Sequence, residues 1–173
     1  MYKLFGTLNI PGDKSVSHRA LILSSMSIGK SEITNLLEAD DIKATIQILK
    51  LLGITIHKKL GKWIVYGNGT NGFLQPKKDL NALNSGTTAR TMIGAVSSNP
   101  INCRFIGDKS LSKRSMSRVT EYLEKLGARF ELTKNDYLPL KTFGTVKLVP
   151  EEIIIKKPSA QIKTALIFAG LNI

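Results

Sequence analysis

The chain of 173 residues has little that would support a disulfide framework, a metal cluster or a membrane span. It contains one cysteine and two histidines, too few for an intramolecular disulfide or a site built of Cys and His ligands. No apolar run approaches the roughly 20 residues that cross a bilayer, and the N-terminus lacks the apolar core of a secretory signal. We therefore expect a cytoplasmic protein without a metal, a cofactor or a membrane partner.

Acidic and aromatic residues are also scarce. The 13 Asp and Glu face 25 Lys and Arg, which gives a net charge of +12, and aromatic residues make up 6%. The excess favours an anionic partner, such as nucleic acid, anionic lipid or a small phosphorylated or carboxylated substrate. A nucleic-acid-binding module is one alternative, but the basic residues are spread along the chain without interleaved aromatics. We expect no nucleic-acid partner.

Apolar periodicity and glycine stops predict a mixed α/β protein with a repeated helix–strand–helix–strand–strand unit. In the first unit we expect one helix over 17–27 and a second helix that ends at Leu52 and is capped by Asp40 or Asp41. The expected strands of this unit lie near 31–36, 54–58 and 62–66. The second has expected helices over 86–97 and 112–126, with strands near 102–106, 129–133 and 145–149. A Leu-Gly pair ends the second helix of each unit, at Leu52-Gly53 and Leu126-Gly127.

A third unit begins near the end of the sequence, with an expected strand at 153–156 and an expected helix over 159–171. That helix carries an apolar set that needs a surface to pack against. The further strands of the unit do not follow before Ile173. We expect the chain to be a piece of something longer, with lowered stability, self-association or a need for the missing part.

Four segments place Gly, hydroxyl and basic residues at or near helix starts, where free N–H groups and the helix dipole favour anions. They are PGDKSVSHR (11–19), NSGTTAR (84–90), GDKSLSKRSM (107–116) and KPSAQIK (157–163). Each also fits a capped helix or a solvated basic face, with Asp13 or Ser15 capping the first. The first is not a Walker A loop, because Asp13 separates Gly12 from Lys14. Two Ser/Thr-rich helix starts, each followed by Arg, favour a shared anion site.

Other polar residues have simpler interpretations. Cys103 alternates with apolar residues in a strand, which is typical of an inert buried thiol. His57 precedes Lys58-Lys59 and is expected to be exposed. His18 is interpreted as a packing residue, with lining of the first anion segment as the alternative. The Asp40-Asp41 pair is interpreted as a helix cap and not as a catalytic dyad.

Taken together, the four segments resemble the signatures of the EPSP synthase family of enolpyruvyl transferases. The patterns PGDKS-[IV]-SHR, N-[SA]-G-T-T-x-R, GDxSLxKRPM and SAQ-[IV]-K occur in this order, and only Ser115 departs, standing where the third has Pro. Related transferases that act on a UDP-sugar lack the first segment. The resemblance covers essentially the whole chain, as the N-terminal part of the family's sequence.

The resemblance implies a fold of two lobes, each built of three βαβαββ units. Residues 1–13 would begin in one lobe, and residues 14–173 would form most of the other. The units would span about 14–83, 84–150 and an incomplete 151–173. The full enzyme would be well over twice as long as this chain.

The resemblance also implies a reaction, the transfer of a carboxyvinyl group from phosphoenolpyruvate to the 5-hydroxyl of shikimate 3-phosphate, on the route to chorismate and aromatic amino acids. The residues implied for shikimate 3-phosphate are Lys14, Ser15, Arg19, Ser159, Ala160 and Gln161. Those implied for phosphoenolpyruvate are Lys14, Gly86 and Arg114, with Asn84, Thr87 and Arg90 shaping the loop. Lys14 is the implied proton carrier and the catalytic candidate.

The family's catalytic Asp and Glu match no acidic residue of this sequence. We therefore expect the chain to bind substrate only in part and to be inactive alone, with the missing C-terminal lobe or a second copy as partner. A non-catalytic remnant that self-associates is the alternative. Gly86 is the small residue expected of forms that bind the inhibitor glyphosate, and Ala there would narrow the pocket.

Overall fold

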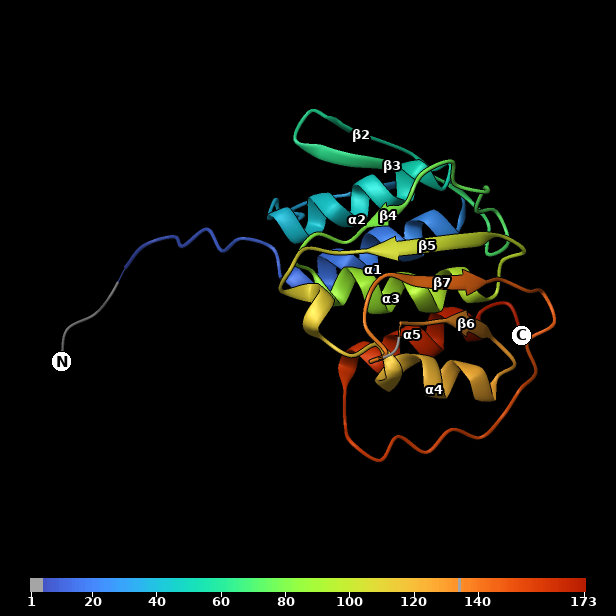
Figure 1. The fold of residues 1–173 in the computed structure, drawn as a ribbon. Coiled ribbons are helices and arrows are strands. Elements are labelled where there is room, and N and C mark those ends of the chain that lie inside the picture. Colours follow the sequence, from blue (N-terminus) through green and yellow to red (C-terminus); the bar gives the residue numbers. More distant parts are fainter. Residues whose placement is uncertain (1–4, 134) are drawn as a thin grey trace.

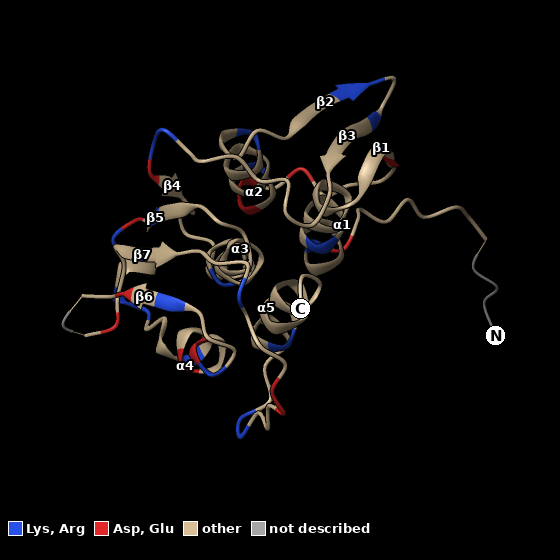
Figure 2. Ribbon diagram, turned by 90° about the vertical axis from the view of Figure 1, so that its right-hand side faces the viewer, with Lys and Arg blue, Asp and Glu red and all other residues tan. Residues whose placement is uncertain are grey.

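The computed structural model describes residues 5–133 and 135–173. Helices α1, α3 and α5 run side by side through the middle, and two sheets lie outside them (Figures 1 and 2). The mixed α/β class predicted from the sequence is confirmed. None of the described helices is both long and apolar enough to cross a bilayer.

The first unit forms a three-stranded antiparallel sheet in the order β1-β3-β2, with two helices against it. Its elements are α1 (Lys14–Met26), β1 (Ile28–Ile33), α2 (Asp40–Leu51), β2 (Thr55–Lys59) and β3 (Lys62–Asn68). Leu60 and Gly61 join β2 to β3 with φ of 49° and 76°. Two positive φ angles are typical of the tight turn that matches the twist of a hairpin.

The second unit has a four-stranded sheet in the order β4-β5-β7-β6. Its elements are β4 (Leu80–Asn81), α3 (Gly86–Ser97), β5 (Asn102–Ile106), the 3₁₀ turn η1 (Leu111–Lys113), α4 (Ser117–Lys125), β6 (Arg129–Glu131) and β7 (Leu140–Phe143). β4 is parallel to β5, and the other pairs are antiparallel. The order of elements in the second unit is therefore βαβαββ. The first unit, from α1 to β3, has the same order except that no opening strand is found among the described residues.

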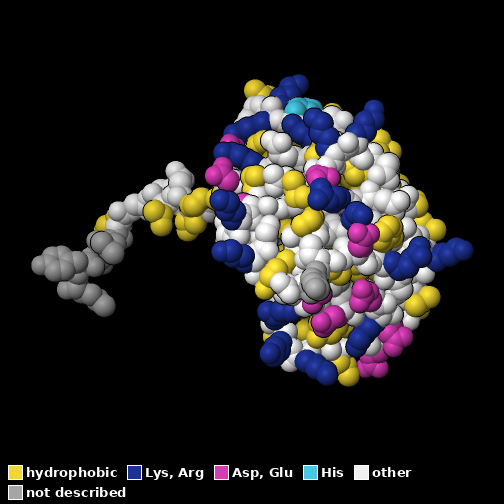
Figure 3. All heavy atoms as spheres, in the orientation of Figure 1, with side chains coloured by type: hydrophobic (Ala, Val, Ile, Leu, Met, Phe, Trp, Pro, Cys, Tyr) yellow, Lys and Arg dark blue, Asp and Glu magenta, His cyan; other side chains and the backbone are white. Residues whose placement is uncertain are grey.

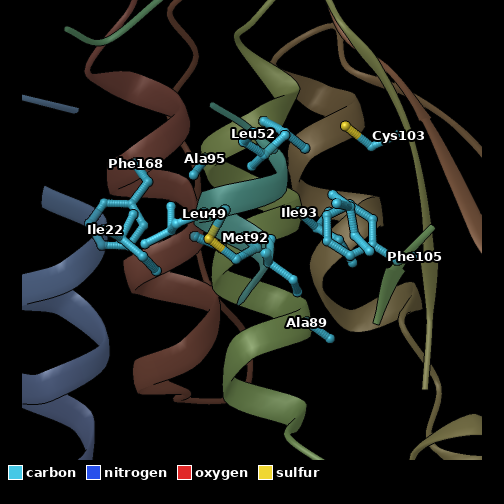
Figure 4. Close-up of a cluster of buried hydrophobic side chains, with 14 of the residues drawn as sticks. Ile22, Leu49, Leu52, Ala89, Met92, Ile93, Ala95, Cys103, Phe105 and Phe168 are labelled. Atoms are coloured by element: carbon cyan, nitrogen blue, oxygen red, sulfur yellow. The ribbon is translucent and has the colours of Figure 1, made fainter. Parts of the chain in front are cut away.

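The core lies where α1, α2, α3 and α5 (Ala160–Gly170) meet. Figure 4 shows Phe168 of α5 and Ile22 of α1 beside Met92 of α3, and all three are buried. Each such side chain contributes about 1.5–3 kcal/mol by leaving water. Gly94 lets α5 approach α3 closely, since a Cβ there would lie 2.3 Å from the Ala165 carbonyl oxygen.

Several expected elements differ from the structure. The helix expected over 112–126 is broken, because η1 ends at Lys113 and Arg114 is extended at φ −103° and ψ 123° before α4 begins. α1 begins at Lys14, earlier than expected, and β1 lies at Ile28–Ile33 instead of 31–36. Asp40 and Asp41 lie inside the first turn of α2, and Ala39 is its N-cap without a side-chain bond.

Two expected strands are absent from the described residues. The backbone of 145–149 bonds to helix ends, with Thr145 N–H donating to Ser97 O at 3.2 Å and Val149 N–H to Leu126 O at 2.9 Å. The place of that strand is taken by β7, which pairs with both β5 and β6. Residues 153–156 have no neighbouring strand in the described structure, and a strand requires one for its backbone hydrogen bonds.

The N-terminal segment leaves the body of the molecule (Figure 1). Phe5, Leu8 and Ile10 are exposed. Figure 3 shows hydrophobic side chains, in yellow, along this segment. The segment joins the body at Gly12, where a Cβ would lie 1.9 Å from the Asn35 carbonyl oxygen. Lys and Arg side chains are scattered over the face drawn in Figure 3 and form no single stripe.

Candidate functional site

The start of α1 carries the first predicted segment. Asp13 is the N-cap, and its Oδ1 accepts a hydrogen bond from Val16 N–H at 2.7 Å. Of the two caps considered, Asp13 is therefore the one used, and Ser15 lies in the first turn. The Lys14 ammonium forms an ion pair with Asp41 at the start of α2. Burial opposes ionisation of Asp41, but the hydrogen bond and charge of Lys14 keep its pKa below the usual value.

The start of α3 brings Gly86 between two guanidinium groups. Ser85 caps the helix by accepting from Thr88 N–H at 3.1 Å. A Cβ on Gly86 would lie 2.6 Å from Arg90 Nη1 and 3.7 Å from Arg114 Nη1. Glycine therefore lets the Arg90 guanidinium lie directly against the start of α3, where any larger residue would displace it.

Arg90 is half-buried and held at two points. Its Nη1 donates to Gln161 Oε1 at 3.0 Å, and its Nη2 donates to Ser115 O at 3.1 Å. Burial lowers the pKa of Arg90, and the positive charges of Arg118 and Arg114 lower it further. An anion bound among these cations would reduce their mutual repulsion, so this part of the structure favours anion binding.

The third segment orders Arg114 through a polar loop. Arg114 Nη2 donates to Asn84 Oδ1 at 3.3 Å, and Asn84 Nδ2 donates to Asp108 Oδ2 at 2.7 Å. Asp108 also accepts from Leu111 N–H, and this bond, above all, lowers its pKa. Asp108 had no predicted role, although an Asp that accepts from N–H groups two and three residues later is typical of such a turn.

The start of α5 carries the fourth segment against α3. Ser159 Oγ caps α5 by accepting from Ile162 N–H at 3.4 Å. Gln161 Nε2 donates to Thr87 Oγ1 at 2.9 Å, while its Oε1 accepts from Arg90. The side-chain amide of Gln161, which the resemblance implies for shikimate 3-phosphate, is thus engaged with protein groups here.

A hollow of about 150 Å³ lies between the starts of α1, α3 and α5. Its lining includes five of the residues predicted for the site: Ser15, Arg19, Thr87, Ala160 and Gln161. His18, Thr91 and Thr164 also line it; Thr91 and Thr164 were not predicted for the site, and His18 was considered for it only as an alternative to packing. Lys14, Asn84, Gly86, Arg90, Arg114 and Ser159 do not line this hollow. A groove of about 690 Å³, lined largely by apolar groups, lies elsewhere, between α5 and residues 150–155.

His18 is fully buried beneath the hollow. Its Nδ1 lies 2.8 Å from Thr45 Oγ1, and its Nε2 has no hydrogen-bond partner among the described residues. Burial lowers its pKa to about 4, Asp41 opposes this and Lys14 adds to it, so the ring is neutral near pH 7. The residue is buried among its neighbours and also lines the hollow, so packing and lining are not exclusive alternatives for it.

The other singled-out residues lie away from the hollow. Cys103 is buried, and burial raises the pKa of its thiol to about 12. His57 is exposed on β2 and stacks on Tyr66, with ring centres 6.1 Å apart. No three His, Cys, Asp or Glu side chains in residues 5–133 and 135–173 are placed to hold a metal ion together.

Known proteins match nearly the whole length of the chain. The family described as EPSP synthase (3-phosphoshikimate 1-carboxyvinyltransferase) matches residues 1–173. The 3-phosphoshikimate 1-carboxyvinyltransferase of Zymomonas mobilis is 43% identical over 170 residues, and that of Novosphingobium aromaticivorans is 42% identical. Each alignment covers 98% of this chain and 38% of the relative.

A solved structure agrees with the sequence matches. EPSP synthase from Acinetobacter baumannii superimposes with a TM-score of 0.91 at 34% identity, over 95% of this chain and 38% of that one. The chain therefore spans well under half the length of the relatives that it matches. Sequence and structure together establish that the chain belongs to the EPSP synthase family, a family of transferases.

Proposed function

We propose that this chain carries part of the substrate site of a 3-phosphoshikimate 1-carboxyvinyltransferase. The hollow between α1, α3 and α5 takes shikimate 3-phosphate, and the adjoining cations around Gly86 take phosphoenolpyruvate. The observation that carries the proposal is the convergence of three helix starts on one hollow, with residues from three separated signatures lining it. Its location would be the cytoplasm, as the sequence indicates.

The electrostatics of the site suit two anionic substrates. Three helix N-termini direct partial positive charge toward the hollow, and Arg19 adds a full charge beside them. The phosphate and hydroxyl groups of the sugar acid would meet Arg19 and the hydroxyls of Ser15 and Thr87. The carboxylate and phosphate of phosphoenolpyruvate would meet the guanidinium groups of Arg90 and Arg114, which can bind such groups with two hydrogen bonds each.

The chemistry requires a proton donor and a base besides these cations. Protonation of phosphoenolpyruvate at C3 lets the sugar hydroxyl add to C2 with loss of its own proton, and expulsion of phosphate from C2 together with loss of a proton from C3 then restores the double bond. We assign the proton delivery to Lys14, whose ammonium is held by Asp41 at the edge of the site. The base that takes the hydroxyl proton would come from a second lobe, and we expect the isolated chain to bind without turnover.

A second lobe also accounts for the surfaces that this lobe leaves uncovered. In this proposal residues 1–13 belong to that lobe, residues 14–173 form one lobe, and its units span about 14–83, 84–150 and 151–173. The exposed Phe5, Leu8 and Ile10 support the first assignment. The apolar groove beside α5 supports an incomplete third unit.

Calorimetric titration of shikimate 3-phosphate into the folded chain tests the proposal. We expect saturable binding that inorganic phosphate does not reproduce, abolished in Arg19→Ala and kept in Arg104→Ala. Arg104 is the matched control because it lies on β5, forms an ion pair with Asp79 and does not line the hollow. A folded chain that binds no shikimate 3-phosphate would overturn the proposal.

A turnover assay tests the expected inactivity separately. Phosphate release from both substrates together should equal that of Lys14→Met, which lacks the proposed proton carrier. Release above this control would show that the isolated chain contains a complete active site and would refute the need for a second lobe.

A further inference from the structure

A chain of buried polar side chains links three helices beneath the hollow. His18 Nδ1 on α1 lies 2.8 Å from Thr45 Oγ1 on α2, which lies 2.9 Å from Thr88 Oγ1 on α3. Thr88 Oγ1 lies in turn 2.8 Å from Oγ of Ser85, the N-cap residue of α3. Each of these four side chains is at most 1% exposed.

A histidine at this buried position is energetically unfavourable in one respect. A buried nitrogen without a partner loses its hydrogen bonds to water, which destabilises the folded state, and His18 Nε2 is such an atom among the described residues. An apolar side chain of similar size would avoid that cost but would lose the contact with Thr45. The bond to Thr45 is therefore the property of His18 that an apolar residue cannot supply.

The network joins the residues next to those that line the hollow. Arg19 follows His18 on α1, and Thr87 precedes Thr88 on α3. Both Arg19 and Thr87 line the hollow, one from α1 and the other from α3. The hydrogen bonds from His18 through Thr45 to Thr88 thus connect the N-terminal halves of α1 and α3.

We propose that His18 is a positioning residue: through Thr45 and Thr88 it sets the spacing between Arg19 and Thr87 that the sugar phosphate requires. This inference rests on the proposed binding of shikimate 3-phosphate. The imidazole acts in its neutral form through Nδ1 and holds no charge for the ligand. Asp41 and Lys14 are the charged groups that face it from α2 and from its own helix.

The test compares His18→Leu, His18→Asn and Thr45→Val in the full chain by calorimetry with shikimate 3-phosphate. We expect His18→Leu and Thr45→Val each to weaken binding about fivefold, the change that corresponds to one net buried hydrogen bond. His18→Asn should restore the affinity, because an Asn amide can reach Thr45 from the place of Nδ1. His57→Leu, on an exposed strand, is the control and should bind like the wild type.

Thermal unfolding separates positioning from a merely structural role. His18→Leu should melt at the wild-type temperature or above it, since it removes the unpartnered Nε2, while its affinity falls. Affinity within about twofold of the wild type in both His18→Leu and Thr45→Val would overturn the inference, since the expected loss is larger. Equal weakness of His18→Asn and His18→Leu would also overturn it. A folded wild type that binds nothing would instead remove the proposed function, and this inference with it.

Discussion

The buried imidazole of His18 should make the stability of the fold depend on pH above the range where carboxylates titrate. Burial holds the pKa of His18 at about 4, and the ordinary value, which the unfolded chain should have, is 6.5. Between these values the unfolded chain binds a proton that the folded chain does not. The contribution of the neutral His18 to the free energy of unfolding is therefore fully present well above pH 6.5. It is lost as the pH decreases toward 4.

The size of the effect follows from the two pKa values. Each unit of difference corresponds to about 1.4 kcal/mol, so the full loss approaches about 3 kcal/mol. Between about pH 7 and about pH 5 the loss should be about 2 kcal/mol. Glu32, Glu38, Asp41 and Asp108 have lowered pKa values, and their contributions disappear only at lower pH.

Urea unfolding at a series of pH values measures this dependence directly. The wild type should lose about 2 kcal/mol across the window from about pH 7 to about pH 5, and His18→Leu should lose almost none. His57→Leu serves as the control, because His57 is exposed, and it should follow the wild type. A His18→Leu curve that falls as steeply as the wild-type curve would refute the assignment of the effect to His18.

Three further outcomes follow from particular contacts. Gly86→Ala should weaken phosphoenolpyruvate binding about tenfold in calorimetry, because its Cβ would lie 2.6 Å from Arg90 Nη1; unchanged affinity would contradict the crowding. Gly94→Ala should lower the free energy of unfolding by about 2 kcal/mol, because its Cβ would meet the Ala165 carbonyl. Gly170→Ala is the control and should leave the free energy of unfolding unchanged, because its Cβ would meet no described atom within 4 Å. Equal urea midpoints for the two variants would refute this. Cys103 should resist thiol reagents until the chain unfolds, since burial raises its pKa to about 12, and rapid labelling of the native chain would show otherwise.

Local signals predicted some elements well. The helix over Gly86–Ser97 and the strand over Asn102–Ile106 are confirmed at the expected residues. Ser85 and its neighbours cap the helix through contacts within a few residues, which a sequence displays directly. The glycines after α2 and α4 likewise mark helix ends, with φ of 88° at Gly53 and 94° at Gly127.

Strand pairing was predicted less well, because it depends on partners far away in the sequence. Residues 145–149 have a suitable alternating pattern, yet β7 at Leu140–Phe143 occupies the place between β5 and β6. The break in the helix expected over 112–126 has a similar cause, since Met116 N–H donates to the distant Asp136 carbonyl at 2.8 Å. Neither competing partner is visible in a local window.

The sequence by itself determined the family and indicated which segments begin helices, because signatures and helix caps are local. Only the tertiary structure decided how those segments meet. It engages Gln161 with Thr87 and Arg90, and it joins His18 to Thr45 and Thr88. These contacts link residues 27 to 74 positions apart, so they exist only after the helices pack and bury the hydrogen-bonding groups between them.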